Sequence, residues 1–142
     1  MNNNMHSISQ TEKDRITSLI SHALDKDERV VFAYIYGSFV CKSFFRDIDI
    51  FAYIRNDEDT FVTQSGIRDN IYEAIISAGF HNIGIDDIDV RVINDAPYDF
   101  VIDILDKGGL LVDKNRGLRT DYIERISDQY RVNYFILDEA YR

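Results

Sequence analysis

Cysteine, proline and tryptophan are almost absent from this chain of 142 residues, which has one cysteine, one proline and no tryptophan. The single cysteine, Cys41, cannot form an internal disulfide, so a reducing compartment is expected. The scarcity of proline leaves no proline-rich linker at which a domain boundary would fall. We therefore expect a single domain over residues 11–142, preceded by a flexible N-terminus over residues 1–10.

Long apolar runs and positive charge are also scarce. No run approaches the ~18 apolar residues of a membrane span, and residues 1–6 lack the basic-then-apolar layout of a signal peptide. These features predict a cytoplasmic protein without a membrane partner. The 16 basic and 25 acidic residues give a net charge of −9, which disfavours direct binding of nucleic acid over a broad surface.

The apolar residues that are present follow helix and strand periods in turn. Helical spacing predicts helices over residues 11–24, about 67–79, 97–107 and 118–141, with a short helical turn from Ser38. Short apolar runs predict strands over residues 30–36, 47–54, 88–93 and 110–112. This order predicts an α/β (α+β) fold with a small sheet, helices packed on one face and an open cleft on the other.

Gly37 and Ser38 end the first of these strands. Glycine permits a tight strand-to-helix turn without a Cβ clash. Ser38 adds a hydroxyl and backbone N–H groups at a helix start, where phosphate binds readily. An ordinary serine cap after a glycine turn is the alternative interpretation. The acidic residues on the next strand favour phosphate binding.

Asp47 and Asp49 open that next strand. The chain contains four Asp-x-Asp pairs, but only this pair begins an otherwise apolar run. Period-two alternation places both carboxylates on one face, with Cα atoms ~6.5–7 Å apart. Like charges this close require a counter-cation, and carboxylate oxygens suit Mg²⁺. We predict a magnesium-bound triphosphate here; the alternative is a strand start exposed to solvent.

Asp89 is the candidate third carboxylate. It shares a strand face with Arg91, opposite the apolar residues of its strand. On an adjacent strand it would complete a metal shell and accept a proton from an incoming hydroxyl. The alternative is a structural Asp89–Arg91 contact. Lys42 and Arg46, in the loop before Asp47, are either further nucleotide-phosphate contacts or solvated basic residues.

Together these residues resemble the signature of the nucleotidyltransferase superfamily, Gly-Ser followed by Asp-x-Asp on the next strand. From about residue 31 onward the chain is similar to minimal nucleotidyltransferase (MNT-domain) antitoxins, which pair with HEPN-domain ribonuclease toxins. The strand of Asp89, which runs into Asn94-Asp95-Ala96-Pro97, also resembles this family. The loop between Ser38 and Asp47 is shorter than the family pattern and has Cys41-Lys42 where Arg-Gly is expected.

The resemblance implies a small mixed sheet of the nucleotidyltransferase type and a Mg²⁺-dependent transfer of AMP from ATP to a tyrosine of a HEPN toxin. Gly37 and Ser38 would hold the phosphates, and Asp47, Asp49 and Asp89 would hold Mg²⁺. Two alternatives stay open. One is a catalytically weak or inactive antitoxin that acts by binding alone, and the other is an enzyme that modifies small molecules of the aminoglycoside type. Homo- or hetero-oligomers also stay open.

Overall fold

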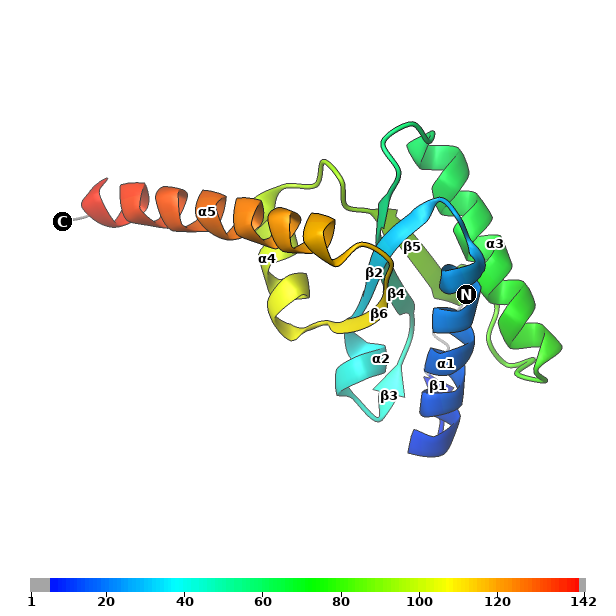
Figure 1. Ribbon diagram of the computed structural model, residues 1–142. Helices are drawn as coiled ribbons and strands as arrows, with labels where there is room; N and C mark the ends of the chain where they lie inside the picture. The colour runs from blue at the N-terminus through cyan, green and yellow to red at the C-terminus, as the bar shows by residue number, and fades with distance from the viewer. Residues whose placement is uncertain (1–5, 141–142) are drawn as a thin grey trace.

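The chain folds around a four-stranded mixed sheet with the strand order β5-β4-β2-β6 (Figure 1). The computed structural model describes residues 6–140. The strands are β2 (Val30–Tyr36), β4 (Ile48–Ile54), β5 (Ile88–Val92) and β6 (Gly109–Asp113). β2 is antiparallel to both β4 and β6, whereas β4 and β5 are parallel. The predicted α/β fold with a small mixed sheet is confirmed.

Every predicted helix is present. The helices are α1 (Gln10–Lys26), α2 (Ser38–Cys41), α3 (Thr60–Ser77), α4 (Tyr98–Lys107) and α5 (Arg116–Ala140), with a 3-10 turn η1 (Ile85–Asp87) before β5. α3 begins earlier than its apolar spacing indicates, because the Asp59 carboxylate accepts a hydrogen bond from the Val62 N–H at 2.9 Å and caps the helix. α5 extends away from the sheet toward the C-terminus (Figure 1). No helix in the described part of the chain has the length and apolarity needed to cross a bilayer.

The N-terminal segment forms a small second sheet. β1 (His6–Ser7) pairs antiparallel with β3 (Phe44–Phe45). Ser9 then caps α1, since its hydroxyl accepts from the Glu12 N–H and the Glu12 carboxylate accepts from the Ser9 N–H. The flexible N-terminus was predicted over residues 1–10; of these, residues 6–10 contain β1, the Ser9 cap and the first residue of α1, whereas residues 1–5 lie outside the described residues. The single domain stays a prediction.

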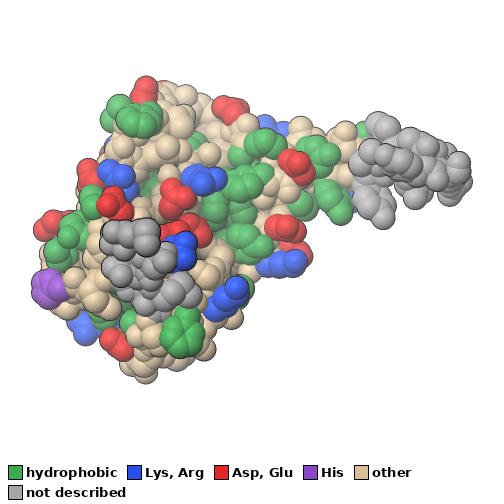
Figure 2. Space-filling view, turned by 180° about the vertical axis from the view of Figure 1, so that it is seen from behind, with side chains coloured by type: hydrophobic (Ala, Val, Ile, Leu, Met, Phe, Trp, Pro, Cys, Tyr) green, Lys and Arg blue, Asp and Glu red, His purple; other side chains and the backbone are tan. Residues whose placement is uncertain are grey.

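One face of the sheet is covered by α1 and α3. These two helices contribute apolar side chains that are almost fully buried against the sheet: Ile16, Ile20, Leu24, Ile67, Ile71 and Ile75. From the sheet, Ala33 and Ile35 of β2 and Ile48, Ile50 and Ala52 of β4 face them. Seen from the opposite side to Figure 1, charged side chains of both signs are interspersed over the body (Figure 2).

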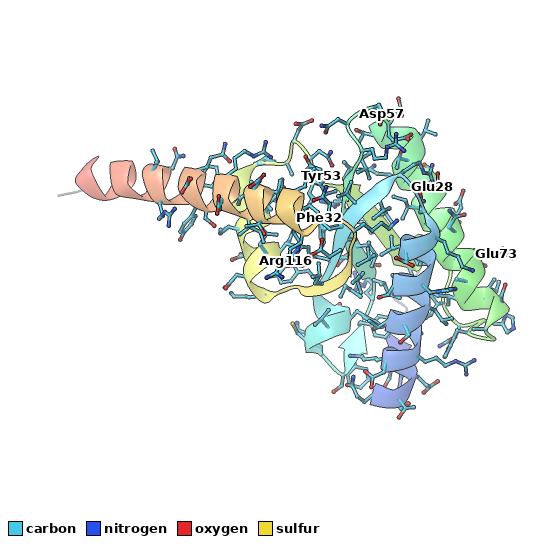
Figure 3. All side chains as sticks on the ribbon, in the orientation of Figure 1. Glu28, Phe32, Tyr53, Asp57, Glu73 and Arg116 are labelled. Carbon is cyan, nitrogen blue, oxygen red and sulfur yellow. The ribbon has the colours of Figure 1, made fainter. Side chains whose placement is uncertain are left out.

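The other face of the sheet is also covered, by α4 and α5. Phe32, Tyr34 and Phe51 pack there against Val101, Ile104, Tyr122 and Ile126. Phe32 stacks on Tyr53 with ring centroids 4.9 Å apart, and both lie between the sheet and α5 (Figure 3). The expectation of helices on one face only is therefore corrected. β2 and β4 carry apolar or aromatic side chains on both faces, and each face must be shielded from water.

We predict that Phe32→Ala lowers the free energy of unfolding by about 3–5 kcal/mol, because Phe32 is fully buried and contacts both the sheet and α5. The matched substitution Phe61→Ala, at a side chain 76% exposed, should change it by less than about 0.5 kcal/mol. Urea denaturation of the two variants provides the measurement. Equal losses would contradict the placement of Phe32 in a core beneath α5.

Candidate active site

The turn between β2 and α2 brings the backbone at Gly37 against a carboxylate. Gly37 has φ = 106°, in the left-handed region that favours glycine. Its carbonyl accepts from the N–H groups of Val40 and Cys41, at 3.1 and 3.2 Å, which starts the helical turn. A Cβ atom at this position would lie 2.8 Å from Oδ2 of Asp49. The positive φ therefore favours glycine, and a Cβ atom at this position would displace the Asp49 carboxylate.

Strand register places Asp49 between β2 and β5. Asp49 is paired with Tyr36, the last residue of β2, and on its other side with Asp89 of β5. Both carboxylates lie on the sheet face opposite the Ile48 and Ile50 core, which is the face predicted from alternation. Asp47, two residues earlier, is half-buried just before β4 begins.

A cavity of about 390 Å³ opens over these residues. It is lined by Tyr36, Gly37, Asp49, Phe51, Asp89, Arg91, Asp99, Phe100, Asp103 and Ile104. The structure thus brings together three of the predicted site residues. The wall supplied by α4, with Asp99, Phe100 and Asp103, was not predicted. Asp99 and Asp103 lie four residues apart and therefore share one face of α4. Whether that face meets the sheet depends on the burial of Val101 and Ile104.

Burial and neighbouring carboxylates together shift the pKa of Asp49 in this cavity. Burial, followed by the charges of Asp89 and Asp47, raises the pKa of Asp49 to about 6, while Arg91 acts in the opposite direction. Arg91 donates from Nε to Oδ2 of Asp89 at 3.2 Å. Its guanidinium also lies 6.0 Å from the Phe100 ring centroid. The structural Asp89–Arg91 contact and the pairing of Asp89 with Asp49 therefore coexist.

The chemistry of these groups fits Mg²⁺. Carboxylate oxygens are the hard donors that this ion prefers, and the pKa of Asp49 is raised first by burial and then by the nearby charges of Asp89 and Asp47. Within the described residues, however, no three Asp, Glu, His or Cys side chains are grouped so that they could hold a metal ion. Arg91 engages Oδ2, one of the two carboxylate oxygens of Asp89.

The other predicted site residues lie outside the lining of this cavity. Ser38 is half-buried as the first residue of α2, directly after Gly37. Lys42 follows α2 and lines a different cavity. Arg46 is exposed in the segment before Asp47. Phosphate contacts from these three residues stay predictions.

Asn94 supports the site from a distance. Its side-chain Oδ1 accepts from the Ile54 N–H at 2.9 Å, and its Nδ2 donates to the Ile54 carbonyl at 2.6 Å. The amide therefore continues the pairing of β4 and β5 after β5 has ended. Pro97 then caps α4. The Asn-x-Ala-Pro segment thus serves to fix β5, and with it Asp89, next to Asp49.

We predict that Asp49→Asn stabilises the fold at neutral pH. The folded-state pKa of Asp49 is about 6, above its ordinary value of 3.8, so the folded chain binds more protons than the unfolded chain between these values. Stability therefore falls as pH rises from about 4 to 6. A shift of this size corresponds to at most about 3 kcal/mol. Because Asp49 is only half-buried, we expect on the order of 1 kcal/mol.

Urea denaturation at pH 4 and pH 7 without divalent cations measures this effect. The difference between Asp49→Asn and the wild type should grow by that amount over the interval. Exposed Asp121 supplies the control, since Asp121→Asn should differ from the wild type equally at both pH values. If Asp49→Asn differed from the wild type in free energy of unfolding by the same amount at both pH values, the raised pKa of Asp49 would be contradicted.

The fold is similar to chains in solved toxin–antitoxin structures. The toxin-antitoxin MntA-HepT structure contains a chain with 15% identity and a TM-score of 0.55, matched over 94% of this chain and 100% of that chain. A structure of tri-AMPylated Shewanella oneidensis HEPN toxin in complex with MNT antitoxin gives 15% identity and a TM-score of 0.56, over 95% and 100%. A toxin–antitoxin structure with AMP-PNP contains a chain with 16% identity and a TM-score of 0.58, matched over 92% of this chain and 98% of that chain. At these identities the likeness shows the fold.

The sequence has no match among curated proteins. The family model of polymerase beta, nucleotidyltransferase, matches residues 19–117, which is more than half of the chain. The matched region includes the glycine-serine turn, the paired aspartates and the Asp89 strand. This chain therefore belongs to the polymerase beta nucleotidyltransferase family.

Proposed function

We propose that this protein is a Mg²⁺-dependent nucleotidyltransferase antitoxin that transfers AMP from ATP to a tyrosine of a cognate HEPN ribonuclease toxin. The observation that carries the proposal is the approach of Gly37 to Asp49 in one cavity, with Asp89 beside them. Membership of a nucleotidyltransferase family supports the reaction class. The likeness to chains in toxin–antitoxin structures, one with an AMPylated HEPN toxin and one with AMP-PNP, supports the partner and the donor.

In this proposal each residue has a distinct role at the nucleotide. Gly37 allows the phosphates to approach the backbone, and Ser38 binds them through its hydroxyl and N–H. Lys42 and Arg46 are proposed as further phosphate contacts. Asp47 and Asp49 would hold Mg²⁺ with Asp89 as the third acidic group, and the ion would neutralise charge on the phosphates.

The transfer itself requires a positioned acceptor and a proton acceptor. The tyrosine oxygen forms a bond to the α-phosphorus of ATP while the bond from that phosphorus to the bridging oxygen breaks, and pyrophosphate leaves. Asp89 is proposed to take the proton of the tyrosine hydroxyl. Phe51 and Phe100, in T-shaped contact with centroids 5.7 Å apart, form the apolar side of the cavity beside the carboxylates.

A second function, an antitoxin that acts by binding alone, is favoured by two observations. Asp89 is engaged by Arg91, and the described acidic residues are not grouped for a metal ion. If this arrangement persists with nucleotide present, complex formation would proceed without transfer.

For either function we propose a cytoplasmic setting, because the single cysteine, Cys41, is free and exposed.

We predict that Asp47→Asn and Asp49→Asn each lower AMP transfer by at least about 100-fold, because both remove a carboxylate proposed to hold the cation. Asp57 belongs to another Asp-x-Asp pair, and its side chain is 68% exposed. Asp57→Asn should therefore retain wild-type transfer. The assay uses labelled ATP, Mg²⁺ and a candidate HEPN partner. EDTA should abolish labelling by the wild type.

The same assay separates the alternatives. Label on the HEPN protein supports the proposal, whereas label on an added aminoglycoside would replace it with small-molecule modification. A stable complex without label, with wild-type protein and Mg²⁺, would leave binding alone as the function. Wild-type labelling by both Asp variants would contradict the proposed roles.

We further predict that Gly37→Ala lowers the rate of transfer strongly whereas Gly79→Ala does not. Both glycines have positive φ, 106° and 99°, so each substitution carries a similar backbone strain of about 1–2 kcal/mol. Only at Gly37 would the added Cβ meet Asp49, since nothing lies within 4 Å at Gly79. Transfer rates, compared after folding is checked by circular dichroism, should differ by about 100-fold. Equal rates would show that the close approach has no catalytic role.

A further inference from the structure

A second cavity, of about 290 Å³, lies at the other end of α2 from Gly37. It is lined by Ile8, Gln10, Lys13, Val40, Cys41, Lys42 and Ser43, and it shares no lining residue with the cavity over Asp49. Its lining contains two lysines and no carboxylate. This composition is unusual in a chain with 25 acidic and 16 basic residues.

Lys13 occupies a position in α1 where a core residue is expected. It continues the inward stripe of Ile16, Ile20 and Leu24 and is only 7% exposed. Its Nζ donates to the carbonyl of Lys42. The ammonium also lies 5.5 Å from the ring centroid of Phe39 and 5.9 Å from that of Phe45. In the part of the chain that is described, no carboxylate forms an ion pair with Lys13.

A buried ammonium without a counter-ion is unfavourable, and the contacts of Lys13 offset this only in part. One carbonyl uses one of its three N–H donors, and two aromatic faces contribute a weaker attraction. The charge itself is not neutralised. An anion in the cavity would supply both the missing charge and acceptors for the remaining donors.

The other polar groups of the cavity are donors as well. Lys42 and Ser43 are both exposed at its margin, so an ammonium and a hydroxyl could reach an anion that also contacts Lys13. The Gln10 amide is partly engaged, since its Nε2 donates to Asp14 at 2.9 Å. The donor set is therefore mainly cationic, as in sites that bind phosphate oxygens.

We propose that this cavity binds a small oxyanion of the phosphate class, with Lys13 as the buried cation and Lys42 as the exposed one. Free pyrophosphate and the terminal phosphates of a bound nucleotide offer the same oxygens to these donors. Because Lys13 also holds the Lys42 carbonyl, an anion here would fix the end of α2 and, through it, the turn at Gly37. Binding needs no turnover, so the site can be tested whether or not the proposed transfer occurs.

Isothermal titration of the full chain with sodium pyrophosphate, without nucleotide or divalent cation, tests the proposal. Lys13→Met should raise Kd by at least about tenfold and Lys42→Met by a smaller factor. Lys26→Met, at an exposed lysine of the same helix, should leave Kd unchanged. Circular dichroism checks folding. If Lys13→Met does not fold, Lys42→Met, which retains the backbone carbonyl that Lys13 contacts, still provides the test.

A repeat titration in saturating AMP-PNP distinguishes the two sources of the anion. Retained pyrophosphate binding assigns the cavity to a free oxyanion, whereas lost binding assigns it to the phosphates of the nucleotide. No pyrophosphate binding to the wild type would overturn the proposal. Equal Kd values for the wild type and both cavity variants would also overturn it.

Discussion

The pairing of β4 with β2 on one side and β5 on the other is the constraint on which the site depends. It sets Asp49 opposite Tyr36, at the start of the glycine turn, and opposite Asp89 on the parallel neighbour. A slip of one residue would turn Asp49 toward the core face occupied by Ile50 and expose that isoleucine. The apolar face of β4 therefore fixes the direction of its carboxylates. The placement of these carboxylates and the packing of the core are consequences of the same register.

The unequal cover of the two sheet faces creates the cavity. α1 and α3 bury one face, whereas α4 and α5 cover the aromatic part of the other, around Phe32. The acidic ends of β4 and β5 remain open beside α4. Partial burial among like charges raises the pKa of Asp49, a cost in stability that a bound cation would relieve. Such a cost is typical of a site shaped for a ligand rather than for stability.

Arg91 holds a central position in this arrangement. It pairs with Asp89 and lies near Phe100, on the wall formed by α4. The guanidinium engages Oδ2, one of the two oxygens of the Asp89 carboxylate, which is paired with Asp49 across β4 and β5. The fold is shared at about 15% identity with chains in toxin–antitoxin structures, because burial pattern and register need few identical residues.

The sequence by itself determined the order of the helices and of the four strands of the main sheet, but not β1 and β3. It also determined the face on which Asp49 and Asp89 lie, and the preference for glycine at the turn. These properties arise from periods of two and 3.6 residues and from the steric limits of one backbone position. Only the tertiary structure decided that Asp99 and Asp103 face the site, that Lys42 lies at a second cavity, and that Lys13 is buried. Each of these depends on which distant segments pack together. A local sequence pattern predicts on which face of a helix or strand a side chain lies, but not which distant segment packs against that face.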